Sequence, residues 1–458
     1  MAKQRFITDF TTGSVSKQLL RFATPLFLAN LLQVVYNMAD MVIVGQVMES
    51  VGLSAVSIGG DVSSFLTFVA MGFSNAGQVI ISQYIGAGQR KKVGAFVGSM
   101  FTFLTGCAVV LSVVCLFFRE GILALMNTPA ASWQEALNYS TVCIAGLIFI
   151  YGYNMVSAVL RGMGDSKHPF IFIAMAAIVN IVLDIVLVWG FRMGAMGAAI
   201  ATVFSQGLSF VCCAVFLWRS RHEMDFEITI GDFLHPKKEY LSALTKLGVP
   251  MAIKSASIHF SKLFVNSWIN SYGVAVSAMA GIVNKLGSIC NLISNSVNAA
   301  GSSMVGQNVG AQKFERVPKI MITCFIFTLC TASLMSAVVY LFPKAVFGIF
   351  TDEAAVLQIA MEFLPIAVVL FLGSACRSPM NALINGSGNH RVNFATAILD
   401  GLIMRIGLSV LFGLLLDMKY LGFWLGDALA GYTPFFIGLV YYFSGNWKTR
   451  KHVIKEEA

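Results

Sequence analysis

An internal repeat constrains the fold of this chain more than any other feature of its sequence. The residues SQYIGA at 82–87 reappear as GQNVGA at 306–311, about half a chain length later. The residues LRGMGD at 160–165 correspond in the same way to INGSGN at 384–389, with the same offset of 224 residues. The chain therefore consists of two related halves.

The composition places both halves in a membrane. Hydrophobic residues make up 57% of the chain, charged residues 12%, and the mean hydropathy is +0.77. An ordinary soluble domain has roughly 25% charged residues. Apolar stretches of about 20 residues, long enough to cross a bilayer as a helix, recur along the chain. The predicted spans cover residues 19–45, 54–79, 93–117, 137–160, 169–190, 194–218, 244–271, 276–304, 317–342, 357–384, 392–416 and 421–443.

These spans predict an all-α membrane protein with twelve transmembrane helices in two pseudo-symmetric six-helix lobes. Because each half has an even number of spans, both halves enter the membrane from the same side, and their pseudo-two-fold axis runs along the membrane normal. The predicted parts are an amino-terminal lobe, a cytoplasmic linker, a carboxy-terminal lobe and a cytoplasmic tail, at 1–218, 219–243, 244–445 and 446–458.

A proline lies in the first predicted helix of each lobe, at Pro25 and Pro250. Proline removes a helical hydrogen bond and favours a bend, so both residues are hinge candidates. The alternative is that the two helices simply tolerate proline.

The net charge of +9 is distributed unevenly between the loops. Basic clusters precede the first span and follow the even-numbered spans, as at residues 90–92 after the second. By the positive-inside rule, this alternation predicts a multi-pass protein of the plasma membrane with both termini in the cytoplasm. The basic charge therefore orients the chain, and we expect no nucleic-acid partner. The other loops contain few basic residues: Arg119, Arg192, Lys344 and Lys419.

Four polar side chains in the first half are predicted to meet inside the membrane. Asp40 and Asp184 lie at a similar depth, roughly 8–9 Å below the outer edge of their helices at the α-helical rise. Asn180 is one turn from Asp184 on the same face, and Thr202 lies at about the same depth on the next helix. Two nearby carboxylates with an amide and a hydroxyl suit a shared proton or Na⁺. The alternative is that each aspartate only holds neighbouring helices together.

The second half has basic residues instead of this acidic pair. Lys285 occupies the position equivalent to Asp61, and no acid falls where Asp40 or Asp184 would repeat. The bases of the second half are Lys254, His259, Lys262, Lys285, Arg377 and Arg405, and the acids beside them are Asp400, Asp427 and Glu362. The bases can form a cationic surface facing a substrate cleft, or internal ion pairs. A pair between Arg405 and Asp400 has an unfavourable spacing of five residues for an α-helix. The candidate substrate contacts are Gln33, Asn154, Lys254, Lys285, Arg377 and Arg405.

Other chemistries lack their sequence signals. The nine cysteines contain no Cys-x-x-Cys pair, and no glycine-rich loop ends in Gly-Lys-Ser or Gly-Lys-Thr. No set of His, Asp and Glu residues suggests a catalytic metal or nucleophile. We therefore expect no enzyme activity and no cofactor, and an ion gradient as the energy source.

The sequence resembles the multidrug and toxic compound extrusion (MATE) family over its whole length. The resemblance lies in residues 36–40 (YNMAD), 180–184 (NIVLD), Thr202 and the loop at 161–165 (RGMGD). It implies an export cycle in which H⁺ or Na⁺ enters and substrate leaves while the lobes alternate between two V-shaped forms. Some members also use an acidic pair in helices 7 and 10, where this chain has Lys254 and Arg377. The resemblance thus implies coupling through the first lobe.

The leading hypothesis is an antiporter, acting as a monomer in the lipid bilayer, that exports small amphipathic organic compounds through alternating access. One alternative is a lipid-linked oligosaccharide flippase of the same superfamily, because a basic cleft favours a pyrophosphate headgroup. Another is an exporter of anionic or zwitterionic metabolites.

Overall fold

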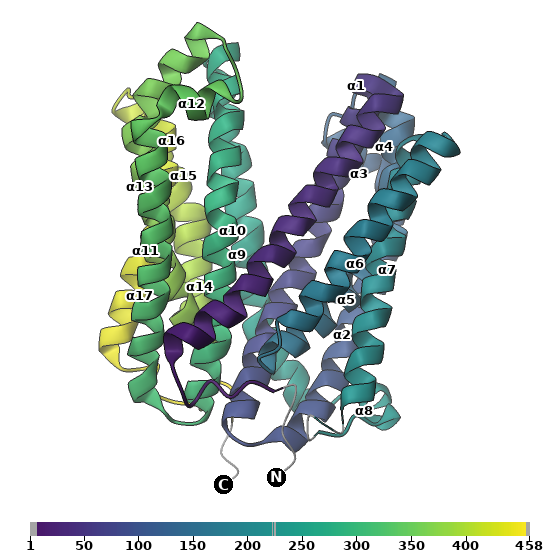
Figure 1. Cartoon of the computed structure of the whole chain (residues 1–458), viewed down its shortest axis with the longest axis vertical. Coiled ribbons are helices and arrows are strands. Elements are labelled where there is room, and N and C mark those ends of the chain that lie inside the picture. Colours follow the sequence, from purple (N-terminus) through teal and green to yellow (C-terminus); the bar gives the residue numbers. More distant parts are fainter. Residues whose placement is uncertain (1–6, 222, 224–225, 455–458) are drawn as a thin grey trace. The chain divides into compact units, whose positions relative to one another are not determined.

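The protein is helical, and a computed structural model describes residues 7–221, 223 and 226–454 (Figure 1). Residues 1–6, 222, 224–225 and 455–458, at the predicted termini and in the predicted linker, lie outside the described residues. The helices of the first half are α1 (Val15–Gly86), α2 (Arg90–Phe117), α3 (Arg119–Leu125), η1 (Ala130–Ser132), α4 (Trp133–Ala145), α5 (Leu147–Gly162), α6 (Lys167–Asp184), η2 (Ile185–Gly190), α7 (Gly194–Ser220) and α8 (Ile230–Leu234). Those of the second half are α9 (Lys238–Asn270), α10 (Val274–Gly310), η3 (Phe314–Arg316), α11 (Val317–Leu341), α12 (Pro343–Gly348), α13 (Ala354–Gly386), α14 (His390–Ile398), η4 (Leu399–Met404), α15 (Arg405–Val410), η5 (Leu411–Leu415), α16 (Lys419–Ala430) and α17 (Thr433–Ser444).

The helices form twelve membrane spans. Within the described residues, nine helices are long and apolar enough to cross a bilayer, or ten when the bent pair α4–α5 is one span. The 72-residue α1 is about 110 Å long at the α-helical rise, far more than one crossing needs. Its backbone leaves the helical region at Glu49, so α1 contains two spans. The remaining span is α9, which is long enough at 33 residues but more polar than the others.

The chain folds into two compact units. Among the described residues, the first comprises residues 7–8 and those of Thr24–Gly248, and the second comprises Asp9–Ala23 and residues 249–454. In the first unit α7 packs against α4, α5 and α6, and in the second α13 packs against α10, α11, α16 and α17. The chain therefore passes from one unit to the other inside α1 and inside α9, in each case two residues before a proline.

The sequence repeat is also a repeat of close backbone contacts. A Cβ atom added to Gly162 would lie 2.8 Å from the carbonyl oxygen of Gln78, and one added to Gly386 would lie 2.8 Å from that of Ser302. Both pairs are related by the offset of 224 residues. Because carbonyl groups of a helix cannot move away cheaply, each site requires glycine. The two halves thus pack their central helices in the same way.

After η4 the offset between the halves increases by one residue. The amide of Met193 donates to the carbonyl of Leu187 at 3.0 Å, and the amide of Met418 donates to that of Phe412 at 3.0 Å. These equivalent bonds are 225 residues apart. The π-helical turn η4 accounts for the difference, because such a turn accommodates one extra residue within a helix.

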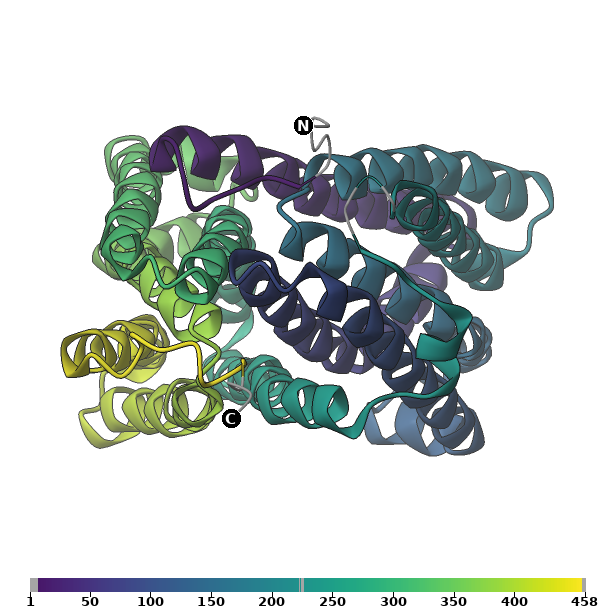
Figure 2. The ribbon, with the colours of Figure 1, turned by 90° about the horizontal axis from the view of Figure 1, so that it is seen from below.

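The segment Asp9–Ala23 is fixed to the second unit by an aromatic anchor. The side chain of Phe10 is fully buried, 5.1 Å from the ring of Phe22. The amide of Phe10 donates to Oε1 of Gln307 at 2.9 Å, and its carbonyl accepts from Nδ2 of Asn308 at 3.1 Å. Figure 2 shows the start of α1 beside the helices of this unit. Further carbonyls of the segment accept hydrogen bonds from two basic side chains, Lys313 and Arg316.

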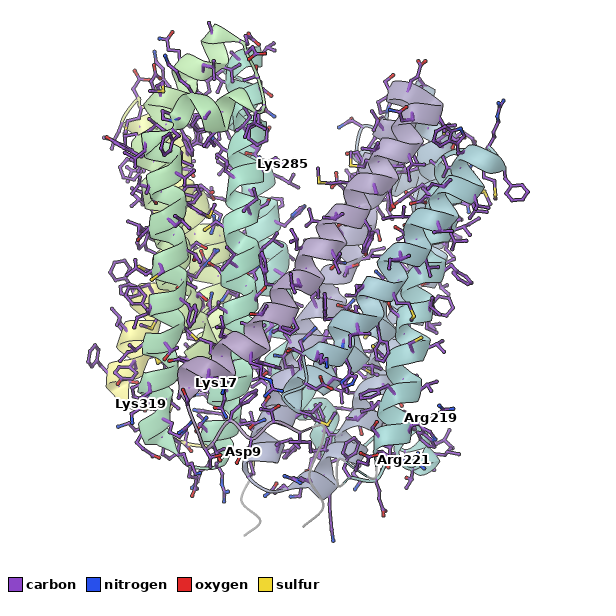
Figure 3. The ribbon with its side chains drawn as sticks, in the orientation of Figure 1. Asp9, Lys17, Arg219, Arg221, Lys285 and Lys319 are labelled. Carbon is purple, nitrogen blue, oxygen red and sulfur yellow. The ribbon has the colours of Figure 1, made fainter. Side chains whose placement is uncertain are left out.

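Charged residues of the second unit lie at two different levels. Asp9, Lys17 and Lys319 lie at the end of the unit where α11 begins, whereas Lys285 lies in the opposite half, on α10 (Figure 3). Partial burial opposes ionisation of Asp9, but hydrogen bonds from Thr11 and Thr12 and the charge of Lys313 outweigh it and lower the pKa of Asp9. The labelled bases of the first unit, Arg219 and Arg221, lie at the end of α7.

The aromatic anchor leads to a prediction about stability. Replacing a buried phenylalanine by alanine costs about 3–5 kcal/mol in packed cores. We therefore expect Phe10→Ala to lower the midpoint of thermal unfolding of the detergent-purified protein. Phe443→Ala is the matched control, because the side chain of Phe443 is 80% exposed. Equal midpoints for the two variants would contradict the anchor.

Candidate functional site

The four polar residues predicted to meet in the first unit do lie together. Asp40 comes from α1, Asn180 and Asp184 from α6, and Thr202 from α7. The hydroxyl of Thr202 donates to Oδ2 of Asp40 at 3.1 Å, and the side chains of Asp184 and Asn180 adjoin the Asp40 carboxylate. The side chains of Asp40, Asn180 and Asp184 are 3%, 1% and 0% exposed.

Close packing of α6 and α7 positions these side chains. A Cβ atom added to Gly197 would lie 3.2 Å from a backbone carbon of Leu187, so the two helices approach closely where α7 begins. Thr202 follows Gly197 by little more than one turn. Asp184 is the last residue of α6, immediately before the π-helical η2. The contact between α6 and α7 therefore brings the carboxylate and the hydroxyl to the same level.

The polar atoms of this site are poorly satisfied by the described residues. Both carboxylate oxygens of Asp184, Oδ1 of Asp40 and both polar side-chain atoms of Asn180 are buried without a hydrogen-bond partner there. A buried polar atom without a partner costs about 1–3 kcal/mol, and a charged one costs more. Two adjacent carboxylates also repel each other when both are ionised. The donor set therefore fits a shared proton or a bound monovalent cation.

Two further side chains adjoin the carboxylates. The hydroxyl of Tyr36, one turn before Asp40, accepts a hydrogen bond from Nε2 of Gln206 at 2.9 Å. Gln206 was not predicted, although it follows Thr202 by four residues on the same face of α7. Tyr139 of α4 is buried near both carboxylates. No sequence signal places Tyr139 there, because spacing along α4 does not show which helix α4 packs against.

Other candidates of the first half lie outside this cluster. Gln33 is exposed and interacts with Tyr36. Asn154 donates to the carbonyl of Ile150 at 2.8 Å, one turn earlier on its own helix. Pro25 lies inside α1, whose only non-helical residue is Glu49, and Pro250 lies inside α9.

Arg405 in the second unit forms a buried ion-pair network. Its guanidinium contacts Oδ1 of Asp400 at 3.1 Å and also Oδ1 of Asp427, and its side chain is 3% exposed. The expectation that a spacing of five residues disfavours the Asp400 pair is wrong. The π-helical η4 contains Asp400 and ends directly before Arg405, and its wider turn, with hydrogen bonds between residues five apart, brings the two side chains to one face.

This network occupies the place of the first unit's polar cluster. With the offset of 225 residues that applies after η4, Arg405 is the counterpart of Asn180, and Asp427 is the counterpart of Thr202. One unit thus brings together two carboxylates with neutral oxygen ligands. The other unit has a guanidinium bound between two carboxylates at the equivalent position.

Two further predicted bases of the second unit contact amides, and a third is exposed. Nζ of Lys254 donates to Oδ1 of Asn381 at 2.6 Å. A guanidinium nitrogen of Arg377 donates to Oδ1 of Asn291 at 2.8 Å. Lys285 is exposed. These residues and Arg405 are therefore not one uniform cationic surface.

Comparisons with known proteins agree on one family. A family model described as MatE matches residues 25–186 and 250–411, one match in each half. Over 443 residues the chain is 28% identical to "Probable multidrug resistance protein YpnP" of Bacillus subtilis, covering 97% of this chain and 98% of the relative.

Solved structures share the fold. An outward-facing multidrug resistance MATE family transporter of the MOP superfamily superposes with a TM-score of 0.87 at 20% identity, covering 98% of each chain. A MOP superfamily transporter from Pyrococcus furiosus, described as having a binding pocket of reverse polarity that suggests a different function, gives a TM-score of 0.85 at 20% identity. That match covers 97% of this chain and 98% of the other.

The Arg405 network leads to a second stability prediction. Removing one partner of a buried ion pair leaves uncompensated charge and costs about 3–5 kcal/mol. Arg405→Met should therefore lower the unfolding midpoint strongly, and adding Asp400→Asn and Asp427→Asn should restore much of it. Lys319→Met, at an exposed position of the same unit, serves as the control. A triple variant no more stable than Arg405→Met would contradict the network.

Proposed function

The chain belongs to the MatE family of multidrug efflux transporters, and we propose that it is an antiporter coupling inward H⁺ or Na⁺ movement to export of small amphipathic organic compounds. The observation that supports this most is the buried carboxylate pair of Asp40 and Asp184, with Asn180 and the hydroxyl of Thr202 beside it. We assign the coupling ion to these four residues. Ionisable side chains inside a membrane are expensive to bury and are retained for function.

The coupling ion stabilises one arrangement of three helices. Without a cation, Asp40 on α1 and Asp184 on α6 repel each other. A proton shared between them, or Na⁺ bound by their oxygens, removes this repulsion and favours close approach of α1 to α6 and α7. A ligand shifts a conformational equilibrium only when it binds one state better. Cation binding meets this condition, because it depends on the distance between α1 and α6.

The second unit does not need a coupling ion at the equivalent position. The guanidinium of Arg405 is a fixed cation that binds both Asp400 and Asp427, and Lys262 lies within electrostatic range of both acids. A single exchangeable site in the first unit therefore supplies the coupling. With the positive-inside orientation, that site lies in the outer half of the membrane, and both termini are cytoplasmic.

Neutralising either carboxylate should abolish coupling. We expect Asp184→Asn and Asp40→Asn each to reduce gradient-driven efflux from proteoliposomes to the level of protein-free vesicles, because an amide binds neither an exchangeable proton nor Na⁺ as a carboxylate does. The control is Asp61→Asn, since Asp61 is an exposed acid on the same helix as Asp40. Full transport by a correctly folded Asp184→Asn protein would refute the assignment.

The hydroxyl of Thr202 should set the affinity for the ion. A hydrogen bond to a charged group contributes about 1.5–3 kcal/mol, or at least about tenfold in affinity. With Na⁺ as the coupling ion, which the hydroxyl oxygen would bind, we expect Thr202→Ala to raise the ion concentration for half-maximal efflux about tenfold. With H⁺, loss of the bond that the hydroxyl donates to Oδ2 of Asp40 destabilises the ionised carboxylate, and we expect that concentration to fall about tenfold instead. Thr202→Ser retains the hydroxyl and the affinity. Proton and sodium gradients imposed separately show which ion is used. An unchanged half-maximal concentration in Thr202→Ala would exclude the hydroxyl from the site.

A further inference from the structure

A stripe of polar side chains follows one face of α10. Its members recur at intervals of three or four residues, which places them above one another on a helix. Large apolar side chains are scarce on the exposed surface of α10. Among the described residues of this helix, the exposed ones are Val274 and Ile289. The stripe consists of Asn284, Ser288, Asn291, Asn295 and Asn298, of which Asn284, Ser288 and Asn295 are exposed.

This stripe does not suit a lipid environment. The neighbouring α11 exposes a series of large apolar side chains, including Ile322, Ile326 and Leu334, as a lipid-facing helix does. Polar side chains in lipid are costly and occur where a helix faces protein or water. The polar face of α10 is therefore a water-accessible surface. Lys285 projects from α10 on the side away from α11 and α13 (Figure 3).

Two cationic side chains are held beside the stripe by neutral groups. Arg377 of α13 donates to Asn291 within the stripe, and Lys254 of α9 donates to Asn381, one turn after Arg377 on α13. Neither base forms an ion pair with a carboxylate among the described residues. An amide oxygen orients a cation but does not neutralise its charge. Asn291 and Asn381 therefore fix two positive charges that stay available to an anion.

The charge balance of the surrounding cluster leaves an excess of positive charge. Lys262, Arg377 and Arg405 lie within electrostatic range of two acids, Asp400 and Asp427, and Lys254 lies within range of Asp400. Four bases and two acids leave a net charge of +2 when all six are ionised. Since both acids pair with Arg405, the excess lies on the other three bases. A positive surface with low-dielectric surroundings concentrates anions.

We propose that the α9–α10–α13 face of the second unit binds the exported substrate and that this substrate is an amphipathic organic anion bearing a carboxylate, sulfonate or phosphate group. Lys254 and Arg377 contact the anionic group, and Asn291 and Asn381 position these two bases. The polar stripe of α10 supplies hydrogen bonds to the rest of the molecule. This inference rests on the proposed export function and adds the charge of the substrate.

Direct binding tests the proposal without any ion gradient. Carboxyfluorescein and 4-methylumbelliferyl phosphate serve as anionic probes and ethidium as a cationic probe, with fluorescence anisotropy of the detergent-purified full-length protein as the readout. We expect at least one anionic probe to bind, and Arg377→Gln and Lys254→Gln each to weaken that binding about tenfold. Arg377→Lys keeps the charge and should retain more affinity than Arg377→Gln. Lys319→Gln, an exposed lysine at the other end of the unit, should bind as the unaltered protein does.

Two results would overturn the anion site. One is binding of ethidium but of neither anion. The other is anion binding that Arg377→Gln and Lys254→Gln leave unchanged although both variants elute as folded protein in size-exclusion chromatography.

Transport measurements separate this inference from the export function. Asp184→Asn should still bind the anionic probe while losing its gradient-driven efflux. If the unaltered protein binds anions but no gradient drives any probe, the export function fails and the anion site stands. If a gradient drives only ethidium, the export function stands and the anion site fails.

Discussion

The cost of burying charge in a membrane governs this structure. Each unit buries two acidic groups in corresponding regions of the repeat, although not at the same positions, and the two units meet the cost in different ways. In the first, Asp40 and Asp184 lie together beside neutral polar groups, which is why we propose that a cation from solution balances them. In the second, Arg405 supplies a cation that is part of the chain. The same fold thus contains a proposed exchangeable site and a counterpart whose acids are bound by a fixed cation.

A one-residue insertion is central to this asymmetry. The π-helical η4 brings Asp400 and Arg405 to the same face and shifts the register of the second half by one residue. An ordinary α-helix would turn these two side chains apart. Once Arg405 holds both acids, Lys254 and Arg377 are left with amide partners only. The local backbone change therefore contributes to the cationic character of the second unit as well as to its stability.

Much of the fold, and the grouping of the four residues of the proposed ion site, could be predicted from the sequence because the relevant signals are periodic. Span length and the repeat led to two sets of six helices, and helical rise alone placed Asp40, Asn180, Asp184 and Thr202 at one level. An α-helical repeat disfavours the pair between Asp400 and Arg405. The pair forms because the backbone there is π-helical. The sequence does not show that Tyr139 lies near the carboxylates, because its position depends on which helices pack together. The attachment of Asp9–Ala23 to the second unit depends on one buried ring, that of Phe10, which has no periodic signal.

The location of the two proposed ligand sites determines what kind of coupling is possible. A cation on Asp40 and Asp184 and an anion on Lys254 and Arg377 bind different units and have opposite charges, so they cannot compete for the same groups. Antiport must then arise because each ligand favours a different conformation. The two helices in which the chain passes between units can transmit such a change of conformation. Helix α1 contains Asp40, and α9 contains Lys254. Each has its proline, Pro25 or Pro250, two residues past the boundary between the units. Because a helix is stiff along its axis, a displacement at either site reaches these boundaries. Proline lacks the backbone N–H for a helical hydrogen bond, so each helix bends there at least cost.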